Sequence, residues 1–172
     1  MFGSNHLLTD EQTEPLQERQ IGMRWRKYGN GIRKFRENDI DRVMQIWLDG
    51  NIQAHDFIQE GYWQSNYETV KQMLPQADIC VYEQNKKILG FIGLTNNYIA
   101  GIFVDENARH KGIGTQLLNQ SKKDRNRLTL HVYKKNKRAV NFYLREGFVI
   151  RAVQTDGNTG EEELELVWNN EI

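Results

Sequence analysis

The chain has 172 residues, and its 23 Lys and Arg residues are balanced by 23 Asp and Glu residues. This length suits one domain with a real hydrophobic core and is short for two. A formal net charge of zero gives no reason to expect a nucleic-acid partner. No apolar run approaches the roughly 20 residues that span a bilayer, and the N-terminus lacks the layout of a signal peptide. We therefore expect a soluble, cytoplasmic protein that acts without a membrane.

Cysteine and histidine positions give no sign of a disulfide or a metal site. Cys80 is the single cysteine and lies in an apolar run, so it cannot form an internal disulfide. This usage fits a reducing compartment. His55, His110 and His131 are too scattered to predict a zinc site.

The first half of the chain predicts a strand, two helices and a three-stranded meander. Residues 1–31 are mostly polar, and we expect an N-terminal arm or extension there, with the domain over 32–168. A strand is expected over 32–36, then a helix ending at Gly50, then a second helix over 65–74. Three apolar runs between residues 77 and 104, separated by polar turns, predict an antiparallel meander.

The second half predicts a helix from near Gly112, a strand over 127–133, a helix from 137, and two final strands over 148–153 and 163–168. Strands and helices are thus interleaved without a regular repeat. The order favours an α/β (α+β) fold, with helices on both faces of a mixed sheet.

Two glycines, Gly112 and Gly114, stand where the third helix should begin. Each costs roughly 1 kcal/mol relative to alanine inside a helix. The start of a helix carries unpaired N–H groups and a partial positive charge, so glycines there would let phosphate oxygens approach closely. An isolated G-x-G can equally be a plain helix start. A P-loop and a dinucleotide fingerprint do not fit, because neither spacing is present.

The segment "RHKGIG" (109–114) after an apolar strand, with "LHVYKKNKRAVNFYLREGF" (130–148) downstream, closely resembles the two signature regions of the GCN5-related N-acetyltransferase (GNAT) superfamily. The resemblance covers residues 32–168. The segment "AHDFIQEGYW" (54–63) is similar to the small bacterial branch that includes protein lysine acetyltransferases. The resemblance to the superfamily implies a mostly antiparallel mixed sheet whose fourth and fifth strands splay apart around acetyl-coenzyme A.

The resemblance also implies roles for particular residues. Tyr143 would protonate the departing thiolate, and Asn136 would contact the cofactor, although a helix cap or core packing would also explain these residue types. The pantetheine arm would pair with Ile102, Phe103 and Val104. The pyrophosphate would be held mainly by backbone N–H groups of Arg109, His110, Lys111, Gly112, Ile113, Gly114 and Thr115.

The acceptor amine must lose a proton before it attacks the thioester. A lysine is neutral only roughly 0.04% of the time at pH 7, a cost of about 4.6 kcal/mol, against about 1.4 for an α-amine. The strand "YIAGIFV" (98–104) holds no acid, so the candidate bases are His55, Asp56 and Glu60. His55 could equally serve in packing or capping. Aromatic side chains that could wall the acceptor pocket are Phe57, Tyr62, Trp63 and Tyr98.

The sequence thus predicts direct acetyl transfer from acetyl-coenzyme A to an amine, with no metal and no covalent enzyme intermediate. Cys80 lies away from both signature regions, which argues against a thiol intermediate. A protein lysine is the first choice of acceptor, and a small amine such as an antibiotic, a polyamine or an amino acid is the second. A non-catalytic module that senses acyl-coenzyme A is a third reading. The chain could be a monomer or a homodimer.

Overall fold

The structure is a computed structural model that describes residues 31–170. The expected N-terminal arm lies outside the described residues except for Gly31. That glycine is the first residue of β1 (Gly31–Lys34) and pairs with Glu83 of the neighbouring strand. Within the described part of the chain, no helix is long and apolar enough to cross a membrane.

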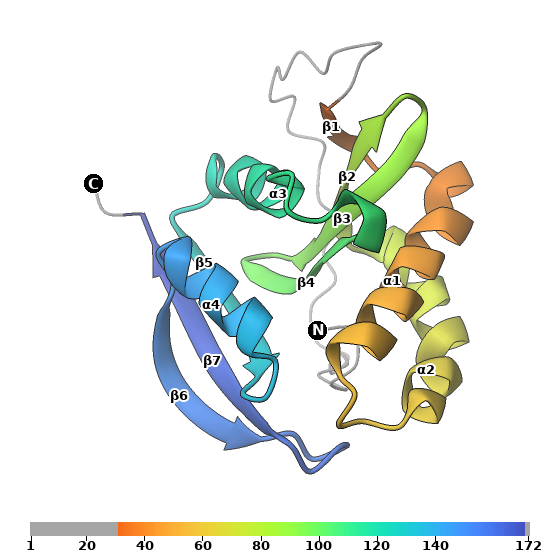
Figure 1. Cartoon of the computed structure of the whole chain (residues 1–172). Coiled ribbons are helices and arrows are strands. Elements are labelled where there is room, and N and C mark those ends of the chain that lie inside the picture. Colours follow the sequence, from red (N-terminus) through yellow and green to blue (C-terminus); the bar gives the residue numbers. More distant parts are fainter. Residues whose placement is uncertain (1–30, 171–172) are drawn as a thin grey trace.

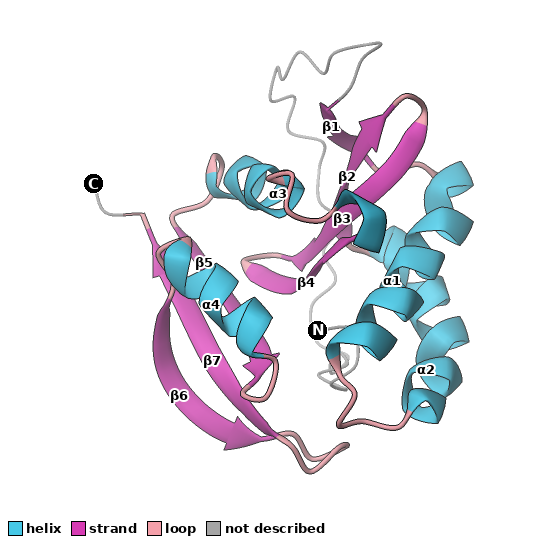
Figure 2. Cartoon of the chain, viewed as in Figure 1, coloured by secondary structure: helices cyan, strands magenta, loops and turns pink. Residues whose placement is uncertain are grey.

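The elements follow one another in the order that the sequence predicts. After β1 come α1 (Ile40–Ala54), α2 (Glu60–Met73), β2 (Asp78–Gln84), β3 (Lys87–Thr95) and β4 (Tyr98–Val104). The second half contains α3 (Ile113–Lys122), β5 (Arg127–Tyr133), α4 (Lys137–Arg145), β6 (Val149–Thr155) and β7 (Glu162–Asn169). Figure 2 shows these helices and strands along the chain.

Two predicted helix boundaries are wrong. The first helix does not end at Gly50 but continues to Ala54, and a Cβ at Gly50 would lie 3.0 Å from the Phe103 ring, so the glycine lets α1 pack closely on β4. The second helix begins at Glu60 rather than near residue 65. Its first turns are helical because Trp63 shares a buried face with Val70, two turns further on.

The strands of the described part of the chain form one seven-stranded sheet in the order β1-β2-β3-β4-β5-β7-β6. All neighbouring strands are antiparallel except β4 and β5, which are parallel. These two share a single register pair, Tyr98 opposite Thr129, and then diverge, as Figure 1 shows. The structure therefore confirms the mixed sheet in which the fourth and fifth strands splay apart.

Helices cover both faces of this sheet, as predicted (Figure 1). Successive residues of β2 face opposite sides, since Ile79 and Val81 pack in the core beneath α1 and α2, whereas Cys80 packs in the core beneath α3 and α4. The sheet thus has two hydrophobic cores, one on each face. The splayed strands β4 and β5 lie between them.

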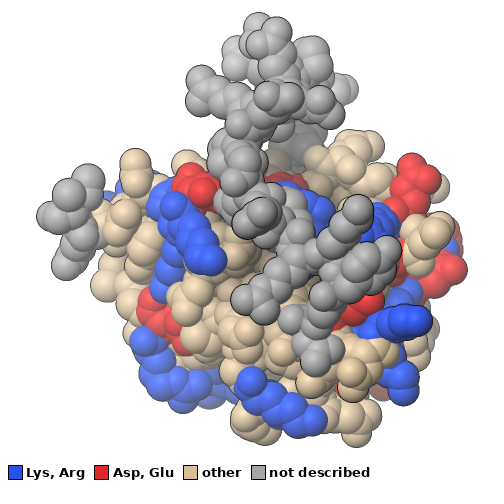
Figure 3. Space-filling view, turned by 90° about the horizontal axis from the view of Figure 1, so that it is seen from above, with Lys and Arg blue, Asp and Glu red and all other residues tan. Residues whose placement is uncertain are grey.

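The outer surface carries both signs of charge. Figure 3 shows Lys and Arg side chains interspersed with acidic and neutral ones on the face that it presents, rather than one continuous basic area. The edge strand β6 is exposed along its whole length, including Val149, Ile150 and Val153.

Candidate active site

A cavity of about 940 Å³ lies where β4 and β5 diverge. Five elements contribute to its lining: the end of α1, strands β4 and β5, the loop that leads into α3, and α4. All residues of the predicted donor-binding set except Lys111 line this cavity, and they come from segments up to 34 positions apart in the chain: Ile102, Phe103, Val104, Arg109, His110, Gly112, Ile113, Gly114, Thr115 and Asn136.

The loop between β4 and α3 has an unusual backbone. His110 and Gly112 have positive φ angles of 63° and 74°, and Gly112 is the residue that caps α3. Side chains rarely adopt this left-handed conformation, which explains a glycine at position 112. A Cβ at Gly112 would meet no atom within 4 Å, so the loop is also open above it.

The first turn of α3 supplies N–H groups to the cavity. The first backbone hydrogen bond of the helix runs from the N–H of Gln116 to the carbonyl of Gly112, at 3.0 Å. The N–H groups of Ile113, Gly114 and Thr115 precede that bond, and all three residues line the cavity. An anion placed there would meet both the N–H groups and the positive end of the helix dipole.

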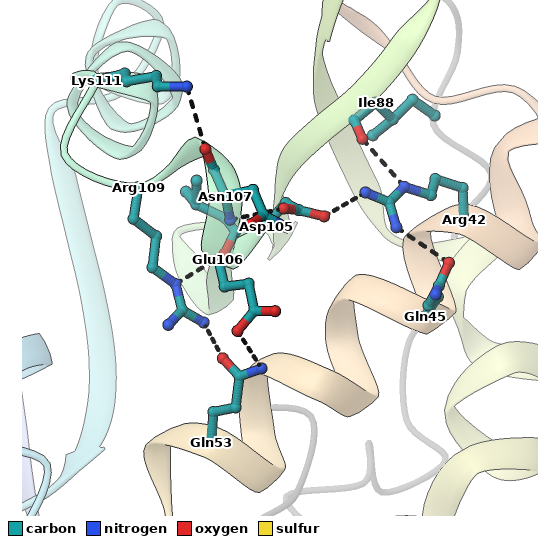
Figure 4. Close-up of polar contacts among 10 residues, drawn as sticks. Arg42, Gln45, Gln53, Ile88, Asp105, Glu106, Asn107, Arg109 and Lys111 are labelled. Carbon is teal, nitrogen blue, oxygen red and sulfur yellow. Dashed lines mark hydrogen bonds and ion pairs between the residues drawn. The ribbon is translucent and has the colours of Figure 1, made fainter.

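The side chain of Arg109 connects this loop to α1 (Figure 4). Its Nη2 donates to Oε1 of Gln53 at 2.7 Å, and its Nε donates to the carbonyl of Val104 at 3.2 Å. Gln53 in turn donates to Glu106, at 3.1 Å. Burial and the like charge of Arg138 lower the pKa of Arg109, so two cations approach each other at the cavity.

A second tether joins the loop to α1 near its start. The guanidinium of Arg42 forms an ion pair with Asp105 and donates from Nε to the carbonyl of Ile88 at 3.2 Å. Lys111 belongs to the same network, since its Nζ donates to the carbonyl of Asn107 at 3.1 Å. Lys111 is exposed and lies outside the lining, so the structure places it beside the cavity rather than in it.

Basic side chains dominate the charged lining. Among residues 31–170, five of them line the cavity, against the single acid Asp56: Arg109, Lys135, Lys137, Arg138 and Arg145. Together with the open N–H groups of α3, this composition fits a ligand with several phosphate groups. The residues present therefore fit coenzyme A.

Asn136 links α4 to the α1–α2 region. Its Oδ1 accepts a hydrogen bond from the N–H of Ala139 at 3.1 Å, so it is the N-cap of α4. Its Nδ2 lies 3.3 Å from Nε2 of His55. Because the Asn136 oxygen is already an acceptor, Nδ2 is the donor and His55 Nε2 accepts.

His55 is almost fully buried, at 1% exposure, and stacks on Trp63 with ring centroids 5.0 Å apart. Burial lowers the pKa of His55 to about 4. The imidazole is therefore neutral at pH 7 and a weak base. Although His55 lines the cavity, its burial and its bond from Asn136 favour a positioning role over proton transfer.

Tyr143 lies on the buried face of α4 and lines the cavity. Its ring packs edge-on against Phe142 and Phe148, so core packing holds it in one orientation. Burial raises the pKa of Tyr143 well above its usual value. The phenol consequently keeps its proton at neutral pH and can donate it into the cavity.

The four aromatic residues expected around the acceptor lie behind the cavity lining. Trp63 is fully buried in the core, and Phe57 contacts the ring of His55 at 5.6 Å. Burial and the charges of Asp156 and Glu163 raise the pKa of Tyr62 to about 12. Burial likewise raises the pKa of the remaining aromatic residue, Tyr98.

The other candidate groups occupy different surroundings. Asp56 lines the cavity, whereas Glu60 is an exposed residue at the start of α2 that does not contribute to the lining. Cys80 is buried on β2, and burial raises the pKa of its thiol. Its position outside the lining gives it no access to a bound thioester.

His131 lines the cavity but was not among the residues predicted for the site. A signal for it exists in "RLTLHVY" (127–133), where Leu128, Leu130 and Val132 alternate with Thr129 and His131. The leucines and the valine are buried under α3 and α4, so His131 faces the other side. Alternation thus indicates its direction, but only the splay of the strands shows that this face is open.

Comparisons with known proteins agree with this geometry. The GNAT acetyltransferase domain model matches residues 75–150. Peptidyl-lysine N-acetyltransferase YiaC of Escherichia coli strain K12 is 32% identical over 121 residues, which are 69% of this chain and 83% of YiaC.

Solved structures show the same fold. The solution structure of apo YjaB from Escherichia coli matches with a TM-score of 0.72 and 25% identity, covering 82% of this chain and 98% of YjaB. An acetyltransferase of Bacillus anthracis strain Ames, solved with acetyl coenzyme A, matches with a TM-score of 0.51 and 26% identity over 55% of this chain and 64% of its own.

Fold, cavity and relatives together define an N-acetyltransferase. The chain belongs to the GNAT acetyltransferase family.

Proposed function

We propose that the protein transfers the acetyl group of acetyl-coenzyme A to the side-chain amine of lysine residues in proteins. The observation that carries this proposal is one cavity in which a basic, N–H-rich loop and the phenol of Tyr143 face the gap between β4 and β5. The name of the relative YiaC, a peptidyl-lysine N-acetyltransferase, supports lysine as the acceptor. The acetyl coenzyme A complex of the Bacillus anthracis acetyltransferase supports the donor.

The donor end of the cavity comprises residues 102–104, 109–110 and 112–115 with Asn136. Here the N–H groups at the start of α3 would hold the pyrophosphate, and Arg109 and Arg138 would balance its charge. Beyond Tyr98, β4 has no register partner on β5, so its backbone edge can pair with the amides of the pantetheine arm. When bound, acetyl-coenzyme A supplies the reactive thioester.

Tyr143 would act on the leaving group. Its raised pKa keeps the phenol protonated, and its packing between Phe142 and Phe148 fixes the position of the hydroxyl oxygen. A protonated phenol beside the departing thiolate can donate its proton as the C–S bond breaks. Backbone N–H groups of the unpaired β4 edge can stabilise the oxyanion that forms on the carbonyl.

The acceptor end lies on the opposite side of the gap, where β5 and β7 face α1 and α2. The negative charges of Asp156 and Glu163 are close enough to raise the pKa of both Tyr62 and Tyr98. A lysine side chain approaches as an ammonium ion, so these carboxylates attract it. Neither carboxylate lines the cavity, so both would act on a cationic acceptor through their electric field rather than by direct contact.

The test is thiol release from acetyl-coenzyme A by the full chain, with lysine peptides, peptides with only a free α-amine, polyamines and aminoglycosides as acceptors. Mass spectrometry would locate the added acetyl group. We expect turnover with lysine peptides and acetylation at the side-chain nitrogen. Turnover confined to a small amine would contradict the proposed acceptor, and tight coenzyme A binding without thiol release from any acceptor would contradict the proposed reaction.

A further inference from the structure

The following inference rests on the proposed function. That reaction requires a group that removes a proton from the acceptor ammonium ion, and no residue has yet been assigned to this step. Strand β4 contains no acid or histidine. His55 is buried and neutral, and its Nε2 accepts from Asn136. Asp56 also lines the cavity, so a base can come from its loop or from another element that faces the gap.

His131 lies on β5 at the gap itself. It is partly exposed and lines the same cavity as Tyr143 and Asn136. The N–H of Thr129, two residues earlier, donates to the carbonyl of Asn97 at the edge of β4. Because backbone direction repeats every second residue, the N–H of His131 also points toward β4, where the strands have separated.

Tyr98 holds the imidazole at this position. The Tyr98 hydroxyl lies 3.1 Å from Nδ1 of His131, and the two rings are 5.6 Å apart at a tilt of 48°. Tyr98 is therefore a positioning residue for His131, fixed at the last point where β4 and β5 still pair.

Carboxylates surround this pair. Glu165 on β7 lies directly opposite His131 and shares its face of the sheet. The titratable and charged groups that face this region from the neighbouring elements are Tyr98, Tyr143, Tyr133, Tyr62, His55, Asp56, Lys135, Asp156, Glu163 and Glu165. The three carboxylates on the β6–β7 side are Asp156, Glu163 and Glu165. They would stabilise the ammonium ion before proton transfer and the imidazolium ion after it.

We propose that His131 is the general base that deprotonates the acceptor amine, with Tyr98 positioning its imidazole. In the tautomer that this role requires, the His131 ring carries its proton on Nδ1. Nδ1–H donates to the Tyr98 oxygen, and Nε2 accepts one proton from the ammonium ion, directly or through one water molecule. The neutral amine then forms the C–N bond to the acetyl carbon as the C–S bond breaks.

The protons balance. Tyr143 gives its proton to the departing sulfur and regains one from the new amide nitrogen. The proton on His131 passes to solvent. The net products are the acetylated amine, the free thiol and one proton.

The sharpest experiment compares two acceptors that differ in their protonation at pH 7. The first is a lysine peptide, and the second is the same peptide with an aminooxy group in place of the side-chain amine, which is already neutral at pH 7. With the lysine peptide, His131→Ala should lower kcat/KM by about 10² to 10⁴-fold. With the aminooxy peptide, the loss should stay below about tenfold, because no base is required.

Three further readouts separate a base from a structural residue. Added imidazole should restore lysine acetylation in His131→Ala, and coenzyme A affinity should not change. The imidazole pKa of His131, measured by NMR in the free protein, should match the inflection in the pH profile of kcat/KM. Tyr98→Phe should shift the imidazole pKa and the inflection of the pH profile together. Two control variants should shift neither value: Thr129→Val, on the same face of β5 as His131, and Tyr82→Phe, on β2.

Equal losses with both acceptors, or full lysine acetylation by His131→Ala, would overturn the proposal. Failure of the proposed function looks different, since the wild-type protein would then acetylate no lysine peptide at any pH.

Discussion

The two ends of the cavity are built in different ways. The donor end consists largely of backbone: one loop, one helix start and one strand edge, within residues 102–115. The acceptor end consists of side chains from distant segments, such as His55, Tyr98, His131 and Glu163. A backbone site needs only the right local conformation, whereas a side-chain site needs the whole sheet to be in place. The two ends should therefore respond differently to substitution.

Tyr143→Phe, between the two ends, should have the largest effect. Without the phenolic proton, kcat should fall by about 10² to 10⁴-fold. The affinity for coenzyme A should stay the same, because the ring still packs between Phe142 and Phe148. Steady-state kinetics and calorimetry measure the two quantities, with Tyr82→Phe as the control. A loss below about threefold would remove Tyr143 from the reaction.

At the acceptor end, the buried imidazole of His55 should make stability depend on pH. Its pKa falls from 6.5 to about 4 on folding, so the unfolded chain binds a proton more readily between these values. Stability is complete above about pH 6.5 and should decrease by roughly 3 kcal/mol as the pH falls through this range to about 4. Urea unfolding at several pH values should show this decrease, and His55→Gln should abolish it. An unchanged slope in the variant would contradict the assignment.

At the donor end, Gly112→Ala should weaken coenzyme A binding by about tenfold, because an alanine strains the left-handed conformation by roughly 1 to 2 kcal/mol. Gly157→Ala is a matched control. Neither added Cβ would meet an atom within 4 Å, and only Gly112 has a positive φ. Calorimetric titration compares the two variants. Equal affinities would show that the loop conformation does not hold the donor.

The smallest effect is expected at the tether between α1 and the donor loop. Gln53→Ala removes the hydrogen bonds to Arg109 and Glu106, and KM for acetyl-coenzyme A should rise about threefold. Gln64→Ala on α2, also exposed, should leave KM unchanged. If both variants behave like the wild type, Arg109 is positioned by its bond to Val104 alone.

The same contrast explains what the sequence could predict. Strand alternation, turn residues and the two signature regions predict the sheet, its splayed strands and the residues of the donor loop, because each signal is local. Gly50 misled the prediction of α1, since the reason for that glycine is Phe103, more than fifty residues away.

The acceptor end was harder to predict for a related reason. The role proposed for His131 depends on a gap between two strands, and the neutral state of His55 depends on burial against Trp63. No short segment of sequence encodes either condition. Tyr98 was predicted as a pocket wall, but its contact with His131 crosses 33 positions of the chain.

The most direct test of a cavity with two distinct ends is NMR chemical-shift mapping on the ¹⁵N-labelled protein, first with coenzyme A and then with a lysine peptide. We predict that coenzyme A shifts the amides of residues 102–104 and 109–115, and that the peptide then shifts a second set around Asp56, His131 and Glu163. If both ligands perturb one and the same set, or if coenzyme A leaves the loop before α3 unchanged, the account is contradicted.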